Sequence, residues 1–571
     1  MKKQSFIALC CATALLTGCS FAGIDLSKYD SSTEDTSSVA ASENASSDNA
    51  SSEGTSSEEN TDTAQFEGEV VPAYKRVYRA DYKYSNDEAY EPILDVKNEV
   101  IMLDGSLESE FSGLASALKA GADEMINGFD ARTEELYNDA LEMYNTDPAY
   151  FNKEYETSSV GITRSDGMFL SYCDYYECYL GGAHGYAATY GHNYFVATGE
   201  EVILRDLIAG SEEDLNSLII DKLYADNEDA ENTFIGIDET LSHYKFTPDP
   251  QKDITSGADD YEIAYNWYMD QDGIHIIFNA YDIADYASGA FDVCLAYDED
   301  IVVSGYAFDK SKGYCYNEYL PLYAEDEAFE NDGLYFKYQG ENDEYGIYVE
   351  SLTLYNGDNS ATFEDCYLNF DSDTYSLNNC YHIVTAGGKE YLYLMAGDEN
   401  DYYGLYVFDI TDGGCSTVDS TWFAEVYIDY DGDEKYVGSS ILSNPNNMVF
   451  GHRCDGLGTF CYYNYFSVGE DGMPKAHSES CKISYVATQS IVSKKDIEME
   501  KLDDTMQPTG EMVTVPSGTK MTIEATDGES WIDVKLSDGS YNRIHIENFG
   551  YEGTIGGVAI QDLFEELIYV G

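Results

Sequence analysis

The chain has 571 residues, of which 108 are acidic and 30 are basic, for a formal net charge of −78 at pH 7. This negative charge argues against nucleic acid as a partner and against adsorption to anionic membranes. It favours cation binding or a cationic protein partner. The roughly 500 residues beyond the N-terminal segments exceed one hydrophobic core and predict about two to four domains.

The first residues predict a bacterial lipoprotein signal. Two lysines precede an apolar run from Phe6 to Leu16, which is shorter than the roughly 20 residues that a membrane-spanning helix needs. The run ends in Leu16-Thr17-Gly18-Cys19, which resembles the lipobox of bacterial lipoproteins. The resemblance implies removal of residues 1–18, lipidation of Cys19, and a protein held at the outer face of the bacterial cytoplasmic membrane by its lipid alone. The alternative is an ordinary cleaved signal that leaves Cys19 as a free thiol.

Residues 19–66 predict a disordered acidic tether. Between residues 31 and 65 the chain has no aromatic residue and almost no apolar one. Such a segment cannot bury enough surface to offset the entropy of ordering it. We therefore expect it to hold the folded part away from the membrane.

Residues 67–307 predict a module of mixed α and β structure. In its long helical stretch, apolar residues such as Leu114 and Leu118 recur at helical spacing. A second helix is predicted where Ser211 and Asp214 form a capping-box pattern. The expected strands are 70–82, 93–103, 159–165, 167–180, 193–202 and 273–283, and the expected helices lie within 105–145, before Pro148, and at 211–226.

Several short motifs follow one another in this module: Tyr179-Leu-Gly-Gly-Ala-His-Gly185, Phe195, Thr198-Gly199, Leu204, Asp206-Leu207, Trp267-Tyr268, Asp272-Gly273 and Ala280–Gly289. In order and spacing they resemble the paired extracellular modules of the lysozyme-sensing anti-sigma factor of Gram-positive bacteria. The same pair is the non-catalytic part of a membrane-bound peptidoglycan deacetylase. The resemblance covers about two fifths of the chain and implies an α+β module that binds a ligand outside the cell, without a cofactor.

In the sensor family the ligand is lysozyme, a cationic enzyme, which would suit an acidic chain. Neither a cytoplasmic helical segment with a transmembrane helix nor a deacetylase motif with metal histidines is found in this sequence. We therefore expect only the binding half of either function to carry over.

The motif around His184 is the candidate site. Glycines at 181, 182 and 185 surround this histidine and predict backbone with positive φ or close packing against another strand. A catalytic or metal-binding role would need an orienting carboxylate, a nucleophile or further ligands, and His192, eight residues on, belongs to no HExxH pattern. We expect Gly181, Gly182, His184 and Gly185 to form a structural turn that can also line a binding face.

Other templates for chemistry give no assignment. The sequence has no GxSxG, P-loop, dinucleotide-binding or kinase motif. With 108 acids, a glycosidase carboxylate pair remains open. The run Asp429–Glu434 alternates carboxylates as calcium ligands do, but its glycine position fits a hairpin turn better than a calcium loop. We expect no catalytic residue, metal or cofactor.

The remainder predicts all-β structure. Residues 308–495 alternate aromatic and polar residues, and units such as Leu405–Gly413 are typical of β-propeller blades, with a β-sandwich as the alternative. Residues 496–571 resemble a bacterial SH3-type barrel through Val515–Ile523 and Trp531, with a short helix at 560–568, although the usual closing Gly-Trp-Val is missing. The cysteine pairs 173/178 and 454/461 could form disulfides or be buried thiols.

These observations favour a lipid-anchored, non-catalytic binding protein of the bacterial envelope. Its expected ligand is a lysozyme-like cationic protein, a peptidoglycan fragment or another glycan, and nucleic acid is not expected. The alternatives are an envelope glycan hydrolase with a carboxylate pair and an accessory regulator of envelope-stress sensing.

Overall fold

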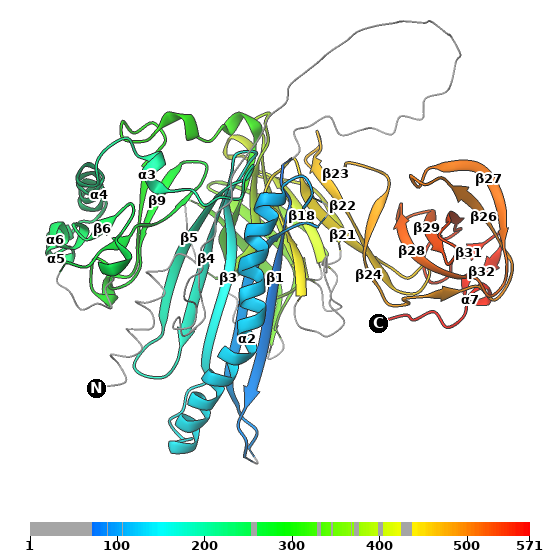
Figure 1. Cartoon of the computed structure of the whole chain (residues 1–571), viewed down its shortest axis with the longest axis horizontal. Coiled ribbons are helices and arrows are strands. Elements are labelled where there is room, and N and C mark those ends of the chain that lie inside the picture. The colour runs from blue at the N-terminus through cyan, green and yellow to red at the C-terminus, as the bar shows by residue number, and fades with distance from the viewer. Residues whose placement is uncertain are drawn as a thin grey trace, which may run out of the picture.

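The computed structural model describes residues 71–87, 89–105, 107–252, 260–327, 333–343, 346–366, 368–370, 376–397, 403–423 and 437–570. Cys19, the tether and the acidic run Asp429–Glu434 lie outside the described residues. The expected fold class is confirmed: mixed α and β structure in the N-terminal part is followed by an all-β remainder (Figure 1).

A six-stranded sheet with one long helix on its face forms the first part. Its strands, in spatial order, are β20 (Val437–Ile441), β1 (Tyr74–Tyr84), β2 (Pro92–Leu103), β3 (Glu154–Ser165), β4 (Phe169–Tyr179) and β5 (Tyr186–Phe195). Strands β2 and β3 pair in parallel, and a parallel pair needs a long crossover connection. Helix α2 (Ser112–Thr146) provides this connection. Leu114, Leu118, Phe129 and Leu136 of α2 are buried, as their helical spacing predicts.

The next elements pack beside the edge of β5 (Figure 1). They are helices α3 (Leu204–Leu207), α4 (Glu212–Asp226), α5 (Ala230–Thr233) and α6 (Ile237–Leu241), and strands β6 (Tyr244–Lys245), β7 (Ile263–Ala264), β8 (Asn266–Met269), β9 (Gly273–Phe278) and β10 (Phe291–Ala296). The α4 N-terminus carries the predicted capping box, since the Ser211 hydroxyl accepts from the Asp214 N–H and the Asp214 carboxylate accepts from the Ser211 N–H. Leu215, Ile219 and Leu223 of α4 share a core with the buried face of β9.

The middle of the chain forms one curled, nearly closed sheet. Its strands are β11 (Tyr314–Ala324), β12 (Leu334–Asp343), β13 (Gly346–Asn356), β14 (Asn359–Phe363), β15 (Leu368–Phe370), β16 (Ser376–Val384), β17 (Glu390–Gly397), β18 (Tyr403–Asp409) and β19 (Ser416–Phe423). The side chains of Asn356 and Asn359 donate to the carbonyls of Gly414 and Gly413, so the two ends of the sheet meet. One continuous sheet around a shared core is closer to the expected sandwich than to separate propeller blades.

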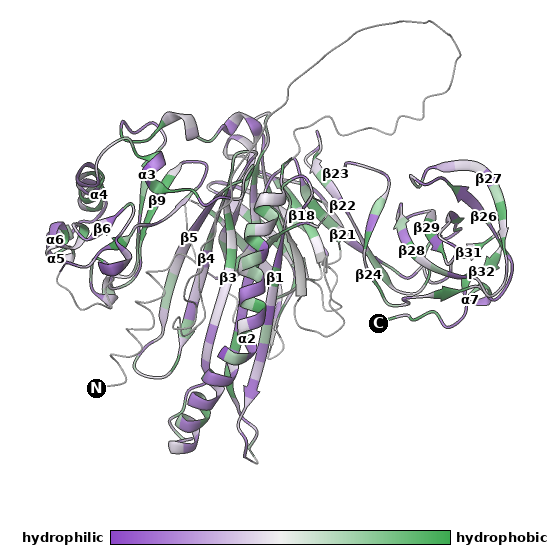
Figure 2. Ribbon diagram, in the orientation of Figure 1, coloured by the Kyte–Doolittle hydropathy of each residue, from purple (hydrophilic) through white to green (hydrophobic). Residues whose placement is uncertain are grey.

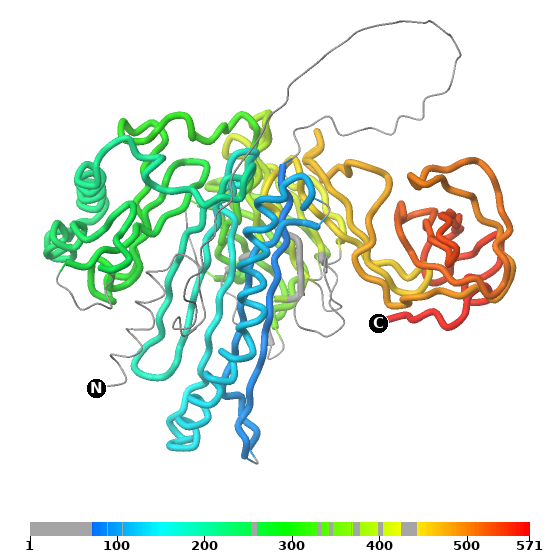
Figure 3. Tube along the Cα trace, viewed as in Figure 1, coloured from blue at the N-terminus to red at the C-terminus, as the bar shows by residue number. Residues whose placement is uncertain are grey.

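A ten-stranded sheet forms the C-terminal part, and it joins strands on both sides of residue 495. Its strands are β21 (Met448–Cys454), β22 (Phe460–Val468), β23 (Pro474–Ala476), β24 (Cys481–Val486), β25 (Ile491–Val492), β26 (Ile497–Leu502), β27 (Pro508–Val515), β28 (Lys520–Thr526), β29 (Trp531–Leu536) and β30 (Tyr541–His545). Its last strands, β26 to β30, curl into a small barrel. Figure 3 shows the trace of this barrel, in orange and red, at the opposite end of the view from β5. The division at 67–307, 308–495 and 496–571 stays a prediction.

The expected C-terminal helix at 560–568 is shorter than predicted. After a small hairpin, β31 (Thr554–Ile555) and β32 (Val558–Ala559), helix α7 spans only Ile560–Leu563. Phe564 is buried and forms a β-bridge with Ser493, and the Glu565 N–H donates to the Val492 carbonyl. This pairing ends the helix, because the Glu565 N–H donates to the Val492 carbonyl and the Leu563 carbonyl accepts from the Lys494 N–H instead of bonding within a further helical turn.

Candidate functional site

One end of the six-stranded sheet gathers four connections. They are the β1–β2 turn, the C-terminus of α2, the segment that leads into β3, and the β4–β5 loop (Figure 1). The pairing register aligns them, since Tyr84 faces Pro92, Tyr155 faces Tyr179, and Cys178 faces Tyr186. The motif singled out in the sequence therefore lies at this end.

The β4–β5 loop depends on its glycines. Gly181 and Gly182 have φ of +80° and +102°, which side-chain-bearing residues rarely adopt. A Cβ on Gly181 would lie 2.4 Å from the Met143 methyl of α2, and a Cβ on Gly185 would lie 2.8 Å from the Cys178 carbonyl oxygen. The loop is therefore pressed against the end of α2 and against its own strand.

The two histidines of the motif are separated by the fold. His184 is exposed, its ring stacks on Tyr286 with centroids 3.9 Å apart, and its Nδ1 lies 2.8 Å from the Gly185 carbonyl oxygen. His192 lies within β5, where its ring stacks on Tyr172 and its Nε2 is 3.6 Å from an oxygen of Asp174. Each histidine thus packs on a different tyrosine, and the structure does not bring the pair into one site.

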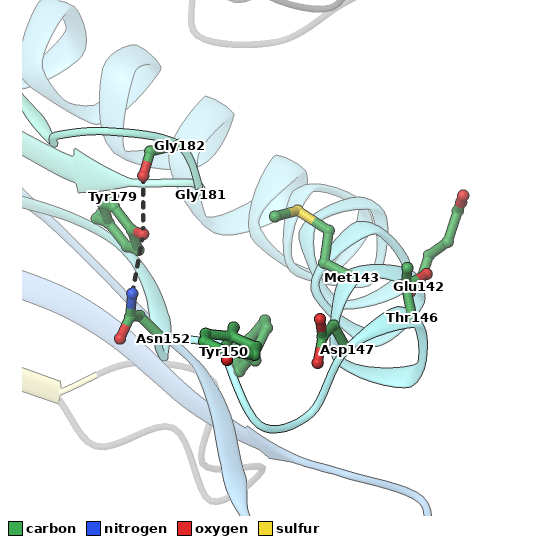
Figure 4. Close-up of a pocket in the computed structure, with 10 residues that line it drawn as sticks. Glu142, Met143, Thr146, Asp147, Tyr150, Asn152, Tyr179, Gly181 and Gly182 are labelled. Carbon is green, nitrogen blue, oxygen red and sulfur yellow. Dashed lines mark hydrogen bonds between the residues drawn. The ribbon is translucent and has the colours of Figure 1, made fainter.

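A hollow of about 440 Å³ opens between the β4–β5 loop and the end of α2 (Figure 4). It is lined by Glu142, Met143, Thr146, Asp147, Tyr150, Phe151, Asn152, Tyr179, Gly181 and Gly182. The Asn152 amide donates to the Tyr179 hydroxyl, which donates to the Gly182 carbonyl, so the strand side of the hollow is tied together. On the other side the Met143 side chain points toward Gly181 (Figure 4).

A buried carboxyl group lies directly behind this wall. Glu154, the first residue of β3, is 2% exposed, and its Oε1 is 3.4 Å from the point where a Cβ on Gly181 would stand. Within the described residues, Oε1 has no hydrogen-bond partner. Burial, together with the nearby charge of Asp139 on α2, raises the pKa of Glu154 to about 7.

The basic side chains close to Glu154 in the chain or on α2 are committed to other acids. Lys153 pairs with Asp95 of β2. Arg132 of α2 makes two hydrogen bonds to the Glu156 carboxylate, of 3.0 and 2.6 Å, and pairs with Glu135. Glu156 is thus a satisfied buried acid, whereas Glu154, two residues earlier on the same face of β3, is not.

Exposed tyrosines surround the same end of the sheet. Tyr150 is 84% exposed and Tyr90 is 67% exposed, and the rings of Tyr84 and Tyr90 stack with centroids 4.5 Å apart. The β1–β2 turn, which carries Tyr84 and Tyr90, is fixed because Asp87 accepts hydrogen bonds from the Ser85 hydroxyl and from the Tyr144 hydroxyl of α2. Tyrosines held on rigid supports are typical of protein-binding surfaces.

A second cluster of ionisable groups, on β8–β10, is structural. His275 contacts Asp270 through Nε2 at 3.1 Å and Asp292 through Nδ1 at 2.7 Å. Burial lowers the pKa of His275, but the bonds to both carboxylates outweigh burial and raise the pKa to about 12. An imidazolium whose two N–H groups are both engaged cannot act as a general base.

Metal and membrane features add no further site. In the described ranges, no group of three or more His, Cys, Asp and Glu side chains is placed to hold a metal ion. The ten cysteines between Cys173 and Cys481 are free thiols, most of them buried, which answers the question about the pairs 173/178 and 454/461. No helix of the described part has both the length and the apolar character that crossing a membrane requires.

Sequence reasoning missed Glu154. The signal was present in the alternation Glu154-Tyr155-Glu156 at the start of β3, where the buried face of the strand takes both acids. Two acids among 108 carry little information in the sequence. Only the packing of α2 and the β4–β5 loop around β3 shows that Glu154 lacks a hydrogen-bond partner for its Oε1.

Comparison with known proteins finds similarity to one family over part of the chain. No curated protein matches the chain. A crystal structure of a DUF3298 family member from Bacteroides fragilis is similar at 19% identity and a TM-score of 0.30, over 41% of this chain and 94% of the other. A DUF3298 family protein from Pseudomonas aeruginosa is similar at 13% identity and a TM-score of 0.26, over 40% of this chain and 92% of the other. Residues 206–298, which include α4 to α6 and β8 to β10, match the family described as "Protein of unknown function (DUF3298)".

Proposed function

We propose that this protein is a non-catalytic binding protein of the bacterial envelope that captures a lysozyme-like cationic protein. In this proposal Cys19 carries the lipid that holds it at the outer face of the cytoplasmic membrane, and residues 19–66 form the tether. The motif resemblance in residues 67–307 and the net charge of −78 support this function.

The acidic, tyrosine-rich end of the six-stranded sheet carries the proposal. Helix α2 alone holds seven acidic and two basic side chains, and hydrophilic residues gather along its C-terminal half (Figure 2). Tyr90 and Tyr150 stand exposed at the same end. Carboxylates steer a cationic protein to the surface, and tyrosines supply contact area at low entropic cost once it arrives.

Hydrolysis is the weaker alternative. Glu154 has the raised pKa of a general acid, but it is 2% exposed beneath Gly181 and the Met143 methyl. A general acid must come within hydrogen-bond distance of the glycosidic oxygen, and Glu154 is not among the residues that line the hollow.

A glycan ligand is the second candidate, and a separate observation favours it. The stacked pair Tyr84–Tyr90 presents an exposed aromatic face on a fixed turn, with Tyr90 held at a φ of +50°. A bulky residue with positive φ is a strained conformation, and such strain clusters at ligand-binding positions.

A capture experiment separates these candidates. The chain from residue 20 would be immobilised and exposed to hen lysozyme, to cytochrome c as a cationic protein of unrelated fold, and to peptidoglycan fragments. Retention of lysozyme over cytochrome c supports the proposal. Equal retention of both proteins indicates charge attraction alone, retention of peptidoglycan only supports the glycan candidate, and retention of none contradicts both.

A further inference from the structure

The hollow at the end of α2 has the chemistry of a cation site. Glu142 and Asp147 line it from the helix side, and none of its ten lining residues is basic. Tyr150, which also lines the hollow and is 84% exposed, lies between Asp147 and the strand side (Figure 4). Its volume of about 440 Å³ is within the range of roughly 300–1,000 Å³ that is usual for small-ligand pockets.

Glu154 provides an independent reason to expect a cation here. A buried carboxylate without a partner is costly, and proteins normally pair it. Its Oε1 has no hydrogen-bond partner within the described residues. This oxygen and the Met143 methyl lie 3.4 and 2.4 Å from the position that a Cβ on Gly181 would occupy. The wall between this oxygen and the hollow is therefore only a glycine and the tip of a flexible thioether.

We propose that this hollow binds a single arginine side chain of the cationic partner. The guanidinium would stack on Tyr150, meet Asp147 at the mouth, and reach Glu154 once the Met143 methyl turns aside. The inference rests on the proposed function for its partner, but the site itself is defined by the side chains around the hollow.

Arginine fits this arrangement better than lysine does. Its planar guanidinium stacks on aromatic rings and offers several donors to more than one carboxylate. The ammonium of lysine is compact and strongly hydrated, so it loses more on entering a hollow lined by Tyr150, Phe151 and Met143.

Ionisation of Glu154 is linked to binding. With its pKa raised to about 7, a large share of this carboxyl group is protonated at neutral pH. The charged groups around it are Asp139 of α2, which raises the pKa further, and Lys153 and Arg132, which are engaged with Asp95 and with Glu156. An arriving guanidinium would lower this pKa and release a proton, so binding strengthens between pH 6 and pH 8.

The test uses tetra-arginine as the probe and the whole chain from residue 20. Isothermal titration would compare the wild type with Glu154→Gln, Tyr150→Ala and Glu529→Gln. The first variant changes the carboxyl group behind the wall of the hollow, and the second removes the tyrosine that lines it. The third removes one exposed charge from the C-terminal barrel as the control. Tetralysine and tetracitrulline are the ligand controls.

Glu154→Gln and Tyr150→Ala should each weaken tetra-arginine binding by about tenfold, and Glu529→Gln by less than about twofold. Tetralysine should bind more weakly, and tetracitrulline not at all. Equal weakening by all three variants, or no binding of tetra-arginine by the wild type, overturns the site. Lysozyme is titrated separately: if the chain binds tetra-arginine through the hollow but not lysozyme, the proposed function fails and the site stands.

Discussion

Replacing Glu154 by glutamine should stabilise the protein at pH 8 and have little effect at pH 5. The carboxyl group has an ordinary pKa of 4.5 and a pKa of about 7 in the folded chain. The folded state therefore holds this proton more tightly, and stability that is fully present below pH 4.5 is lost as the pH rises through 7. Glutamine has the same shape but never ionises, so it avoids this loss.

The magnitude follows from the two pKa values. The difference between 7 and 4.5, at about 1.36 kcal/mol per pH unit, sets an upper limit of about 3 kcal/mol. The effective dielectric constant close to a hollow at the surface is higher than in a deep core, which reduces the expected gain to about 2 kcal/mol at pH 8. At pH 5 the gain should be below about 1 kcal/mol, because little of the folded-state carboxyl group is ionised there.

Hydrogen-exchange mass spectrometry on peptides from β3 would measure this difference. It gives the free energy of local opening at each pH once intrinsic exchange rates are divided out. Glu529→Gln, on the exposed surface of the C-terminal barrel, is the control and should leave β3 unchanged. If Glu154→Gln protects β3 equally at both pH values, or at neither, then Glu154 does not carry the burial cost assigned to it.

Three other predictions concern the fold around the site and beyond it. In thermal melting, Gly181→Ala should lower the free energy of unfolding by about 2 kcal/mol and Gly182→Ala by about 1 kcal/mol. Both glycines have positive φ, but only at Gly181 would the added Cβ meet a side chain, that of Met143. Equal losses would contradict the contact with α2. Arg543→Ala should cost about 3–5 kcal/mol in denaturant unfolding, because it strands the Asp533 carboxylate, which is 1% exposed; an unchanged midpoint would contradict this. His275 should stay protonated from pH 5 to pH 9, so its ring signals in histidine-labelled NMR spectra should not move, and a titration near pH 6.5 would refute its double pairing.

Local patterns in the sequence predicted the local structure well. The capping box at Ser211 and Asp214 and the buried stripe of α2 follow from rules that involve neighbouring residues only. Most predicted strands also fell close to the observed ones. Two predictions were wrong in their bounds: the strand predicted at 193–202 is β5, which spans Tyr186–Phe195 and is followed by a turn, and β9 ends at Phe278 rather than at Ile283 because a turn begins at Asn279.

Pairing over long distances was beyond the same reasoning. Strand β20 pairs with β1 across more than three hundred residues, and no local pattern marks either as the partner of the other. The C-terminal helix was predicted too long because its apolar residues have helical spacing. In the structure Phe564 instead forms a β-bridge with Ser493. Glu154 illustrates the same limit, since its environment is made by α2 and by a loop that follows β4.

The glycine motif was predicted as a turn that can line a binding face. The positive φ of Gly181 and Gly182 shows why these positions take glycine, and both line the hollow. The binding role of the motif stays a prediction. His184 lies on the outer side of the loop against Tyr286, so the side chain that drew attention in the sequence is not among those that line the hollow.

The most direct test of the central claim is a calorimetric titration of the chain from residue 20 with hen lysozyme at low salt and at about 0.15 M salt. Capture of a lysozyme-like protein predicts saturable one-to-one binding that weakens only in part at the higher salt, because tyrosine contacts and a buried ion pair persist when long-range attraction is screened. Binding that disappears at the higher salt would show only that a highly acidic chain attracts a basic one. The absence of binding at both salt concentrations would contradict capture of a lysozyme-like protein.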